Sequence, residues 1–143
     1  DLSMTRFNIA LSEGVDMVLW ALKNSLGGEI FIPKIPSYRI LDVAEAIAPK
    51  CEIKVVGVRP GEKIHEEMIT LADSKSTYDL GNYYMILPSD GSANTKYHDS
   101  NQDLKKVPDG FSYNSGMNNH FLSVNEIRNL IRKNLDPEFT PFN

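Results

Sequence analysis

The chain has 143 residues, of which 41% are hydrophobic and 24% are charged, and these values exclude wholesale disorder and suit one globular domain or part of one. A net charge of −4 without long Lys/Arg runs argues against a nucleic-acid surface, although a nucleotide diphosphate needs only two or three cations. Cys51 is the single cysteine, so a disulfide framework is excluded. With no apolar run of membrane-spanning length and no signal peptide, we expect a cytoplasmic protein and no membrane partner.

The first elements in chain order are a strand and a helix. Residues 5–11 alternate polar and apolar side chains, which predicts a short strand or an extended arm. Ser12 suits a helix N-cap, and the apolar spacing that follows predicts a well-buried helix ending near residue 25, with Trp20 in the core. The apolar stripe of this helix consists of Val15, Val18, Leu19 and Leu22.

The next segments continue the alternation of strands and helices. Residues 29–33 are predicted to form a strand, and Ser37 is predicted to cap a helix over residues 38–48. The β-branched run at residues 53–58 predicts another strand, and a short helix is expected over residues 64–69. This order favours an α/β fold built in layers.

The second half of the sequence is more polar. Residues 83–88 are predicted to form a short edge strand, and residues 89–120 form a long excursion rich in Ser, Asn, Asp and Gly. Ser123 is the predicted N-cap of a last helix over residues 124–134. Glu126, at the third helical position, is expected to complete a capping box there.

The motif RPGEK at residues 59–63 carries the strongest chemical signal. Arg59 follows a predicted strand, and Pro60 suits the first turn of a helix, whose free N–H groups favour anions. An arginine fork at this place predicts a phosphate site, and Glu62 either pairs with Arg59 or accepts hydrogen bonds from hydroxyl groups of the same ligand. The same spacing also fits a surface loop with an i, i+3 charge pair.

Several other kinds of site are not indicated by the sequence. It contains no G-x-G-x-x-G turn, no Walker A loop and no Tyr-x-x-x-Lys pair, so a dinucleotide domain is expected outside this chain. Because the sequence begins at Asp1 and enters structured-looking sequence at once, we expect a fragment of a longer protein. His65 is interpreted as a surface or hydrogen-bonding residue. His98 and His120 have no metal-ligand spacing, and no metal is predicted.

Several segments in fixed order resemble the nucleotide-sugar 4,6-dehydratases. The resemblance is closest to the inverting UDP-N-acetylglucosamine 4,6-dehydratase/5-epimerases of pseudaminic acid synthesis, which are related to CapD-like polysaccharide proteins. It covers nearly the whole chain and is weakest over residues 89–110. The segments that carry it are MTRF (4–7), GEIFIPKIPS (28–37), GVRPGEKIHEEMI (57–69), YYMILP (83–88) and FLSVNEIR (121–128).

The resemblance implies an extended short-chain dehydrogenase whose Rossmann core lies upstream of this chain and binds NADP. The present chain is then the C-terminal part, an α/β substrate-binding lobe. It divides into a nucleotide-sugar-binding region over residues 1–88 and a C-terminal extension with a terminal helix over residues 89–143. The family reaction oxidises the sugar at C4, eliminates water across C5–C6 and returns the hydride to C6. The catalytic groups would lie upstream, so this chain alone is expected to be inactive and to hold no catalytic residue.

The resemblance also implies four substrate-binding residues. Arg6 and Arg59 align with arginines that bind the diphosphate, and Glu62 aligns with the acid that accepts hydrogen bonds from the ribose hydroxyls. Lys34 would lie near the uridine or the phosphate, although it also fits a solvated loop lysine. The chemistry of these side chains agrees, because two guanidinium forks bind a pyrophosphate bidentately and a carboxylate accepts from vicinal hydroxyls.

The expected partners are UDP-N-acetylglucosamine or a similar UDP-sugar and a second copy of the chain in a homo-oligomer. Two alternatives remain open at this point. One is a related UDP-sugar epimerase or a retaining dehydratase. The other is a non-enzymatic binding or oligomerisation module in which the charged motif pairs only internally.

Overall fold

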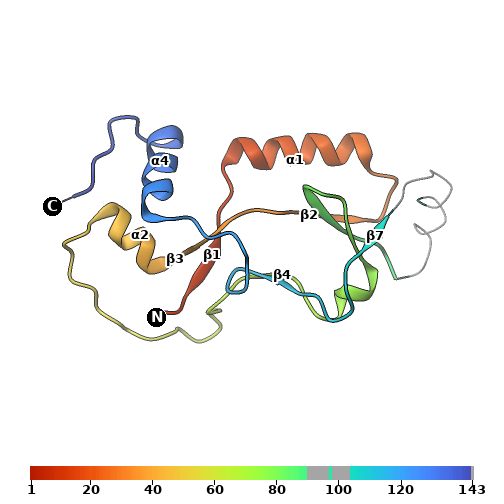
Figure 1. Ribbon diagram of the computed structural model, residues 1–143, viewed down its shortest axis with the longest axis horizontal. Coiled ribbons are helices and arrows are strands. Elements are labelled where there is room, and N and C mark those ends of the chain that lie inside the picture. Colours follow the sequence, from red (N-terminus) through yellow and green to blue (C-terminus); the bar gives the residue numbers. More distant parts are fainter. Residues whose placement is uncertain (90–96, 98–103, 143) are drawn as a thin grey trace. The chain divides into compact units, whose positions relative to one another are not determined.

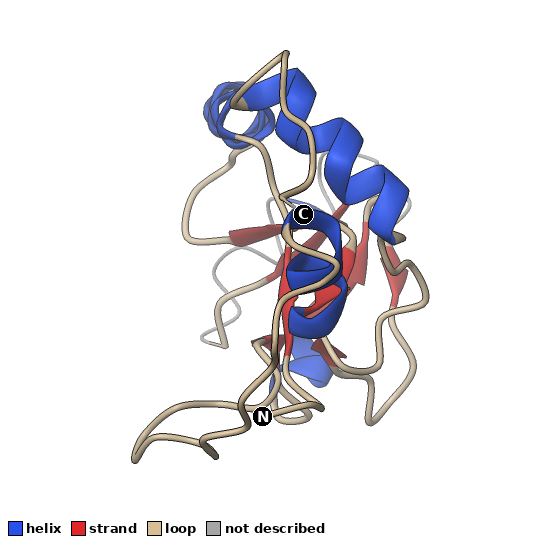
Figure 2. Cartoon of the chain, turned by 90° about the vertical axis from the view of Figure 1, so that its left-hand side faces the viewer, coloured by secondary structure: helices blue, strands red, loops and turns tan. Residues whose placement is uncertain are grey.

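The computed structural model describes residues 1–89, 97 and 104–142 and shows a mixed α/β fold (Figure 1). The chain divides into two compact units. Unit 1 comprises residues 1–10, 35–66 and 114–143, and unit 2 comprises residues 11–34 and 67–113. Both units contain residues from before and after position 88, where the sequence suggested a boundary. The strands are two to four residues long, and long loops connect them (Figure 2).

Unit 1 contains a two-stranded antiparallel sheet. It pairs β1 (Thr5–Phe7) with β3 (Ser37–Arg39), with Arg6 opposite Tyr38. The helices of this unit are α2 (Ile40–Ile47) and α4 (Val124–Asn134). Their shared core consists of Ala46, Leu122 and Ile127, surrounded by Tyr38, Val43, Val124, Leu130 and Ile131.

The prediction that Ser37 caps a helix over residues 38–48 is wrong. Ser37 is fully buried in β3, and α2 begins only at Ile40, after Arg39, which provides no side-chain cap. The reason is that the backbone of Ser37 forms hydrogen bonds with residues far along the chain in place of helical ones, which the local sequence does not reveal. The N–H of Ser37 donates to the carbonyl of His120 at 2.9 Å, and its carbonyl accepts from Leu122 at 2.8 Å. These long-range bonds hold Ser37 extended.

The capping box of the last helix is confirmed. The backbone N–H of Glu126 donates to Ser123 Oγ at 3.3 Å, and the backbone N–H of Ser123 donates to Glu126 Oε2 at 2.7 Å. Hydrogen bonds from the Ser123 backbone and hydroxyl hold the pKa of Glu126 below its ordinary value.

We expect Ser123→Ala to lower the free energy of unfolding by about 1 kcal/mol, because it leaves a helix N–H without its acceptor. Thermal denaturation measures this loss, with Ser89→Ala at an exposed position as the matched control. Because the pKa of Glu126 is lowered, the contribution of its carboxylate is present above the unfolded-state pKa and fades as the pH falls. Equal melting temperatures for both variants would contradict the prediction.

Unit 2 contains a four-stranded antiparallel sheet in the order β2-β6-β5-β7. Its strands are β2 (Ile30–Pro33), β6 (Tyr83–Ile86), β5 (Thr77–Asp79) and β7 (Lys105–Lys106). The sheet core consists of Met85, Leu87 and Tyr97, with Phe31, Tyr78, Leu80 and Leu104 against it. Two further strands of the chain are β4 (Glu67–Ile69) and β8 (Tyr113–Asn114).

The predicted strand at residues 83–88 is present, but its predicted position at the sheet edge is wrong. β6 lies between β2 and β5, with Ile86 opposite both Ile30 and Thr77. The polar segment before it supplies the second neighbour. A short 3₁₀ helix, η1 (Asp73–Ser76), leads into β5, and the hydroxyl of the fully buried Thr77 donates to the Asp73 carbonyl at 2.7 Å.

The predicted N-terminal helix is present as α1 (Leu11–Asn24), but the expectation that it is well buried is wrong. It has no buried residue, and its apolar stripe is exposed: Leu11, Val15, Val18, Leu19 and Leu22. Trp20 lies on another side of the helix. Its ring meets Phe31 edge-on at 5.1 Å and stacks on Tyr83 at 4.3 Å, both measured between centroids. α1 therefore covers β2 and β6 with one side only.

The predicted strand at residues 53–58 and the predicted helix at residues 64–69 are both wrong. Residues 51–60 form neither helix nor strand, and β4 occupies the end of the expected helix. Ile53, Val55 and Val56 are exposed, so the β-branched run has high strand propensity but no strand to pair with in the described residues.

Candidate functional site

The RPGEK motif forms a tight turn rather than the start of a helix. The N–H of Glu62 donates to the Arg59 carbonyl at 3.0 Å, which closes a four-residue turn. Pro60 stands at the second position, and Gly61 has a φ of 81°, the left-handed value that a type II turn requires at its third position. The expected helix N-terminus for a phosphate is therefore wrong, and any anion affinity at this place must come from side chains.

This turn and β1 bring Arg6, Arg59 and Glu62 together. Glu62 lies between the two arginines: its Oε1 is 3.6 Å from Arg6 Nη2, and its Oε2 is 3.9 Å from Arg59 Nε. A fourth residue, Glu66, places Oε1 3.3 Å from Arg6 Nε. Glu66 was not predicted, because a helical interpretation of residues 64–69 gave its carboxylate no relation to Arg6. We call these four residues the arginine–carboxylate cluster.

The two arginines of the cluster differ in their hydrogen bonds to the protein and in the exposure of their side chains. Nη1 of Arg6 donates to the carbonyls of Thr5 at 2.7 Å and Ile64 at 3.1 Å, and its side chain is only 20% exposed. The Arg59 side chain is 89% exposed, and within the described residues its one ion pair is the 3.9 Å contact to Glu62. Arg6 is thus a structural anchor in this conformation, while the Arg59 fork remains able to meet a ligand.

The cluster has the chemistry for a ligand that carries both phosphates and hydroxyls. A guanidinium binds phosphate oxygens bidentately, and a carboxylate accepts hydrogen bonds from sugar hydroxyls. As internal ion pairs these contacts contribute little to stability, because Glu62 and Glu66 are partly exposed to water. Arg6 is the member of the cluster whose hydrogen bonds to main-chain carbonyls tie it to the fold, and the ion pairs themselves add little.

Lys34 belongs to unit 2 and has other partners. Its Nζ forms an ion pair with Asp79 and lies 4.4 Å from the ring centroid of Tyr84. Partial burial raises the pKa of Asp79, but the hydrogen bonds from Lys34 and the Gly81 N–H outweigh it, so the pKa is lowered overall. The contacts of Lys34 neither require nor exclude a ligand.

The histidines do not form a metal site within the described residues. No group of three His, Cys, Asp or Glu side chains there is arranged to hold an ion, and His98 lies outside those residues. His65 makes a hydrogen bond, as interpreted from the sequence, although it is not in a helix: its Nδ1 lies 2.8 Å from Thr5 Oγ1.

Among the helices of the described residues, none is long and apolar enough to cross a membrane.

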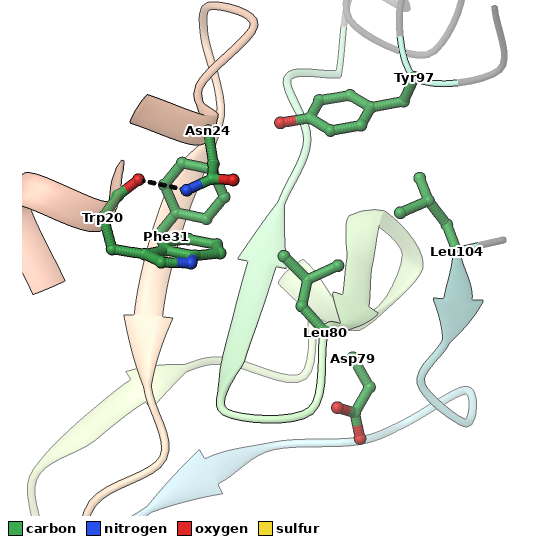
Figure 3. Close-up of a pocket in the computed structure, with 7 residues that line it drawn as sticks. All are labelled: Trp20, Asn24, Phe31, Asp79, Leu80, Tyr97 and Leu104. Atoms are coloured by element: carbon green, nitrogen blue, oxygen red, sulfur yellow. Dashed lines mark hydrogen bonds between the residues drawn. The ribbon is translucent and has the colours of Figure 1, made fainter. Parts of the chain in front are cut away.

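A cavity of about 410 Å³ lies in unit 2, and none of the predicted site residues lines it (Figure 3). Its walls combine apolar and aromatic side chains with polar groups, and Asn24 donates from its side chain to the Trp20 carbonyl at 2.7 Å. The hydroxyl of Tyr97 donates to Glu29 Oε1 at 2.9 Å, and burial raises the pKa of this tyrosine. The lining residues are Trp20, Asn24, Phe31, Asp79, Leu80, Tyr97 and Leu104.

Residues 1–88 match the family described as polysaccharide biosynthesis protein. This segment includes the whole arginine–carboxylate cluster and more than half of the chain. The chain therefore belongs to the polysaccharide biosynthesis protein family.

Individual relatives have more specific names. The chain is 45% identical over 140 residues to a UDP-N-acetylglucosamine 4,6-dehydratase (inverting) of Campylobacter jejuni, a match covering 92% of this chain and 40% of the relative. It is 36% identical over 138 residues to a UDP-glucose 4-epimerase of Rickettsia felis, covering 94% of this chain and 40% of the relative.

A solved structure, Pen from Bacillus thuringiensis, superimposes with a TM-score of 0.74 at 28% identity. The match covers 94% of this chain and 39% of Pen. The chain thus spans about 40% of the length of these relatives, consistent with the expected C-terminal part of an extended short-chain dehydrogenase.

Proposed function

We propose that this chain is the UDP-sugar-binding part of a UDP-N-acetylglucosamine 4,6-dehydratase (inverting). In this proposal the whole enzyme is a lyase of pseudaminic acid synthesis, which supplies precursors for surface polysaccharide or flagellin glycans. The observation that carries the proposal is the arginine–carboxylate cluster, in which the exposed fork of Arg59 stands beside Glu62. The similarity to the Campylobacter jejuni dehydratase supports the choice of reaction.

In this proposal the cluster residues bind different parts of the nucleotide. Arg59 binds the diphosphate, and Glu62 accepts hydrogen bonds from the ribose hydroxyls. Arg6 contributes to the diphosphate site and holds Glu62 and Glu66 in place through its ion pairs. Lys34 contacts the uridine or a phosphate after exchanging its partner Asp79.

The cofactor of the proposed reaction, NADP, is assigned to the remainder of the protein. In the part of the chain that the structure describes, no strand leads through a glycine-rich turn into a helix, which is the arrangement that binds a dinucleotide pyrophosphate. The residues present therefore do not fit NADP. We place the catalytic groups outside this chain as well, and we assign it no catalytic residue.

The exposed stripe of α1 supports the assignment to a larger protein. Side chains at positions 11, 15, 18 and 22 recur at helical spacing, and all are more than half exposed although they are Leu or Val. Because the relatives are about two and a half times as long, the remainder of the protein is the occupant that we propose for this stripe. The protein is further proposed to be a cytoplasmic homo-oligomer, with its nucleotide-sugar region at residues 1–88.

Two assays on the full-length protein that contains this chain test the proposal. Calorimetry is expected to detect UDP binding, and incubation with UDP-N-acetylglucosamine is expected to yield the 4-keto-6-deoxy sugar. The 143-residue chain alone is expected to produce no keto sugar. Turnover by this chain alone would overturn the assignment of the catalytic groups. Absence of UDP binding by the full-length protein would instead favour a non-enzymatic module.

The match to the UDP-glucose 4-epimerase of Rickettsia felis supports a second candidate, a UDP-sugar epimerase. A retaining dehydratase belongs to the same group of alternatives. Each uses the same nucleotide, so the cluster residues would keep their roles. NMR of the product separates the three, since an epimerase keeps oxygen at C6, and the two dehydratases differ in configuration at C5.

A further inference from the structure

A hydrogen-bonded chain of three side chains lies in unit 1 beside the arginine–carboxylate cluster. Thr5 Oγ1 lies 2.8 Å from His65 Nδ1 and 2.7 Å from Ser115 Oγ, and Ser115 Oγ accepts the backbone N–H of Glu66 at 2.9 Å. Thr5 and Ser115 are both buried, and Ser115 has no exposed surface. We call this chain the hydroxyl relay (Thr5, His65 and Ser115).

The protons in the hydroxyl relay run in one direction. Ser115 Oγ accepts from Glu66, so its own proton needs an acceptor, and within the described residues Thr5 Oγ1 is the acceptor at hand. The proton of Thr5 then goes to His65 Nδ1. Two alternatives exist: Thr5 donating to Ser115, or Nδ1–H donating to Thr5. Each would leave one buried hydroxyl proton without a partner among the described residues. The neutral imidazole therefore accepts at Nδ1 and carries its proton on Nε2.

A glycine leaves room for the same ring to approach the backbone closely. A Cβ atom built on Gly116 would lie 2.6 Å from both Cγ and Nδ1 of His65, far inside van der Waals contact. Gly116 does not have a positive φ, so backbone conformation does not explain the glycine. A glycine is needed at this position because the His65 imidazole lies where a Cβ atom would be.

The hydroxyl relay and Arg6 hold residues 64–66, which include Glu66 of the cluster and follow Glu62 directly after Lys63. Glu66 is bonded to Ser115 twice, through its N–H to Oγ and through its carbonyl to the Ser115 N–H at 2.8 Å. The carbonyl of Ile64 accepts from the Thr5 N–H at 3.0 Å and from Arg6 Nη1 at 3.1 Å. Neighbouring side chains of a strand point to opposite faces. Thr5 and Arg6 therefore contact residues 64–66 from opposite faces of β1, Thr5 through His65 and Arg6 through the Ile64 carbonyl and Glu66.

We propose that His65, Thr5 and Ser115 are positioning residues, which lock residues 64–66 against β1 so that Arg6, Glu62 and Glu66 keep their binding geometry. His65 acts through Thr5 and does not itself contact the ligand. This inference rests on the proposed UDP-sugar site, because the geometry that it preserves is that of the cluster.

The test uses calorimetry with UDP on the full-length protein. Thr5→Val and Ser115→Ala interrupt the hydroxyl relay and are expected to weaken UDP binding roughly tenfold, the scale of one lost charge-assisted contact. Thr5→Ser keeps the hydroxyl and is expected to bind like the wild type. Thr140→Val makes the same chemical change at an exposed position and is the matched control. Gly116→Ala is expected to displace the ring and to weaken binding as Thr5→Val does.

A second measurement is made on the wild type, and a variant serves only to assign the signal. In ¹⁵N NMR of histidine-labelled protein, with His65→Gln used for assignment, the Nδ1 signal is expected at the position of an unprotonated acceptor nitrogen. A proton on Nδ1 overturns the inference. Unchanged UDP affinity in folded Thr5→Val, while Arg59→Ala weakens it, also overturns the inference but leaves the proposed function intact. If neither Arg59→Ala nor Thr5→Val alters binding, the proposed site and the inference fail together.

Discussion

Replacing Arg59 by alanine is expected to weaken UDP binding by the full-length protein by on the order of 1.5–3 kcal/mol, about tenfold or more in affinity. The reason is the loss of a bidentate, charge-assisted contact to the diphosphate. The stability should change by less than about 0.5 kcal/mol, because the Arg59 side chain is 89% exposed and its contact with Glu62 spans 3.9 Å. Calorimetry and thermal denaturation of the same sample measure both quantities.

Arg6→Ala gives the comparison that makes this prediction specific. Its guanidinium is largely buried and has two carbonyl and two carboxylate partners, so its removal should lower the free energy of unfolding by about 1–3 kcal/mol. Arg59→Lys keeps the charge but loses the fork and should recover only part of the affinity. Lys63→Ala, a charge loss in the same loop, is the control. If Arg59→Ala destabilised the fold and left UDP binding unchanged, the motif would be an internal ion pair only.

Leu22→Glu on α1 is expected to have different effects on the isolated chain and on the full-length protein. In the isolated chain it should reduce self-association without loss of helix signal, because Leu22 is 76% exposed there. In the full-length protein it should lower stability by on the order of 2–4 kcal/mol, because it would place a charge in the proposed interdomain contact. Light scattering and circular dichroism follow the first effect, and thermal denaturation follows the second.

Lys23→Glu is the control for this pair of measurements. It introduces the same acidic side chain on α1 at an exposed position outside the apolar stripe. It should lower the stability of the full-length protein by no more than about 1 kcal/mol, because an acidic residue in the last helical turn opposes the helix dipole. Equal effects of Leu22→Glu and Lys23→Glu in the full-length protein would show that the stripe is not a contact with the remainder.

Local signals in the sequence were sufficient for some elements. The capping box of Ser123 and Glu126 depends on residues three apart, and the structure confirms it. The apolar spacing of α1 identified a helix, but periodicity cannot say what covers the stripe, and its predicted burial was wrong. The run at residues 53–58 failed for a related reason: strand propensity is realised only where another strand is available to pair.

The candidate site was predictable only in part. Arg59 and Glu62 were predicted from the RPGEK motif and Arg6 from the resemblance, and the structure brings them together through shared ion pairs. Their roles in binding remain predictions. Glu66 was missed because the wrong secondary structure was assigned to its segment. Ser115 was beyond reach of any local pattern, since 110 residues separate it from Thr5.

The interleaving of the two units has a consequence for how the chain is made. Unit 2 is formed by residues 11–34 and 67–113, so all of its residues are synthesised before the last segment of unit 1. Unit 1 must wait for the segment from residue 114 onward, which supplies Ser115 and α4. Until then its N-terminal strand lacks those contacts, and closing so long a loop carries an entropic cost. The nascent chain would therefore gain the contacts that hold the arginine–carboxylate cluster only after all of unit 2 has been synthesised.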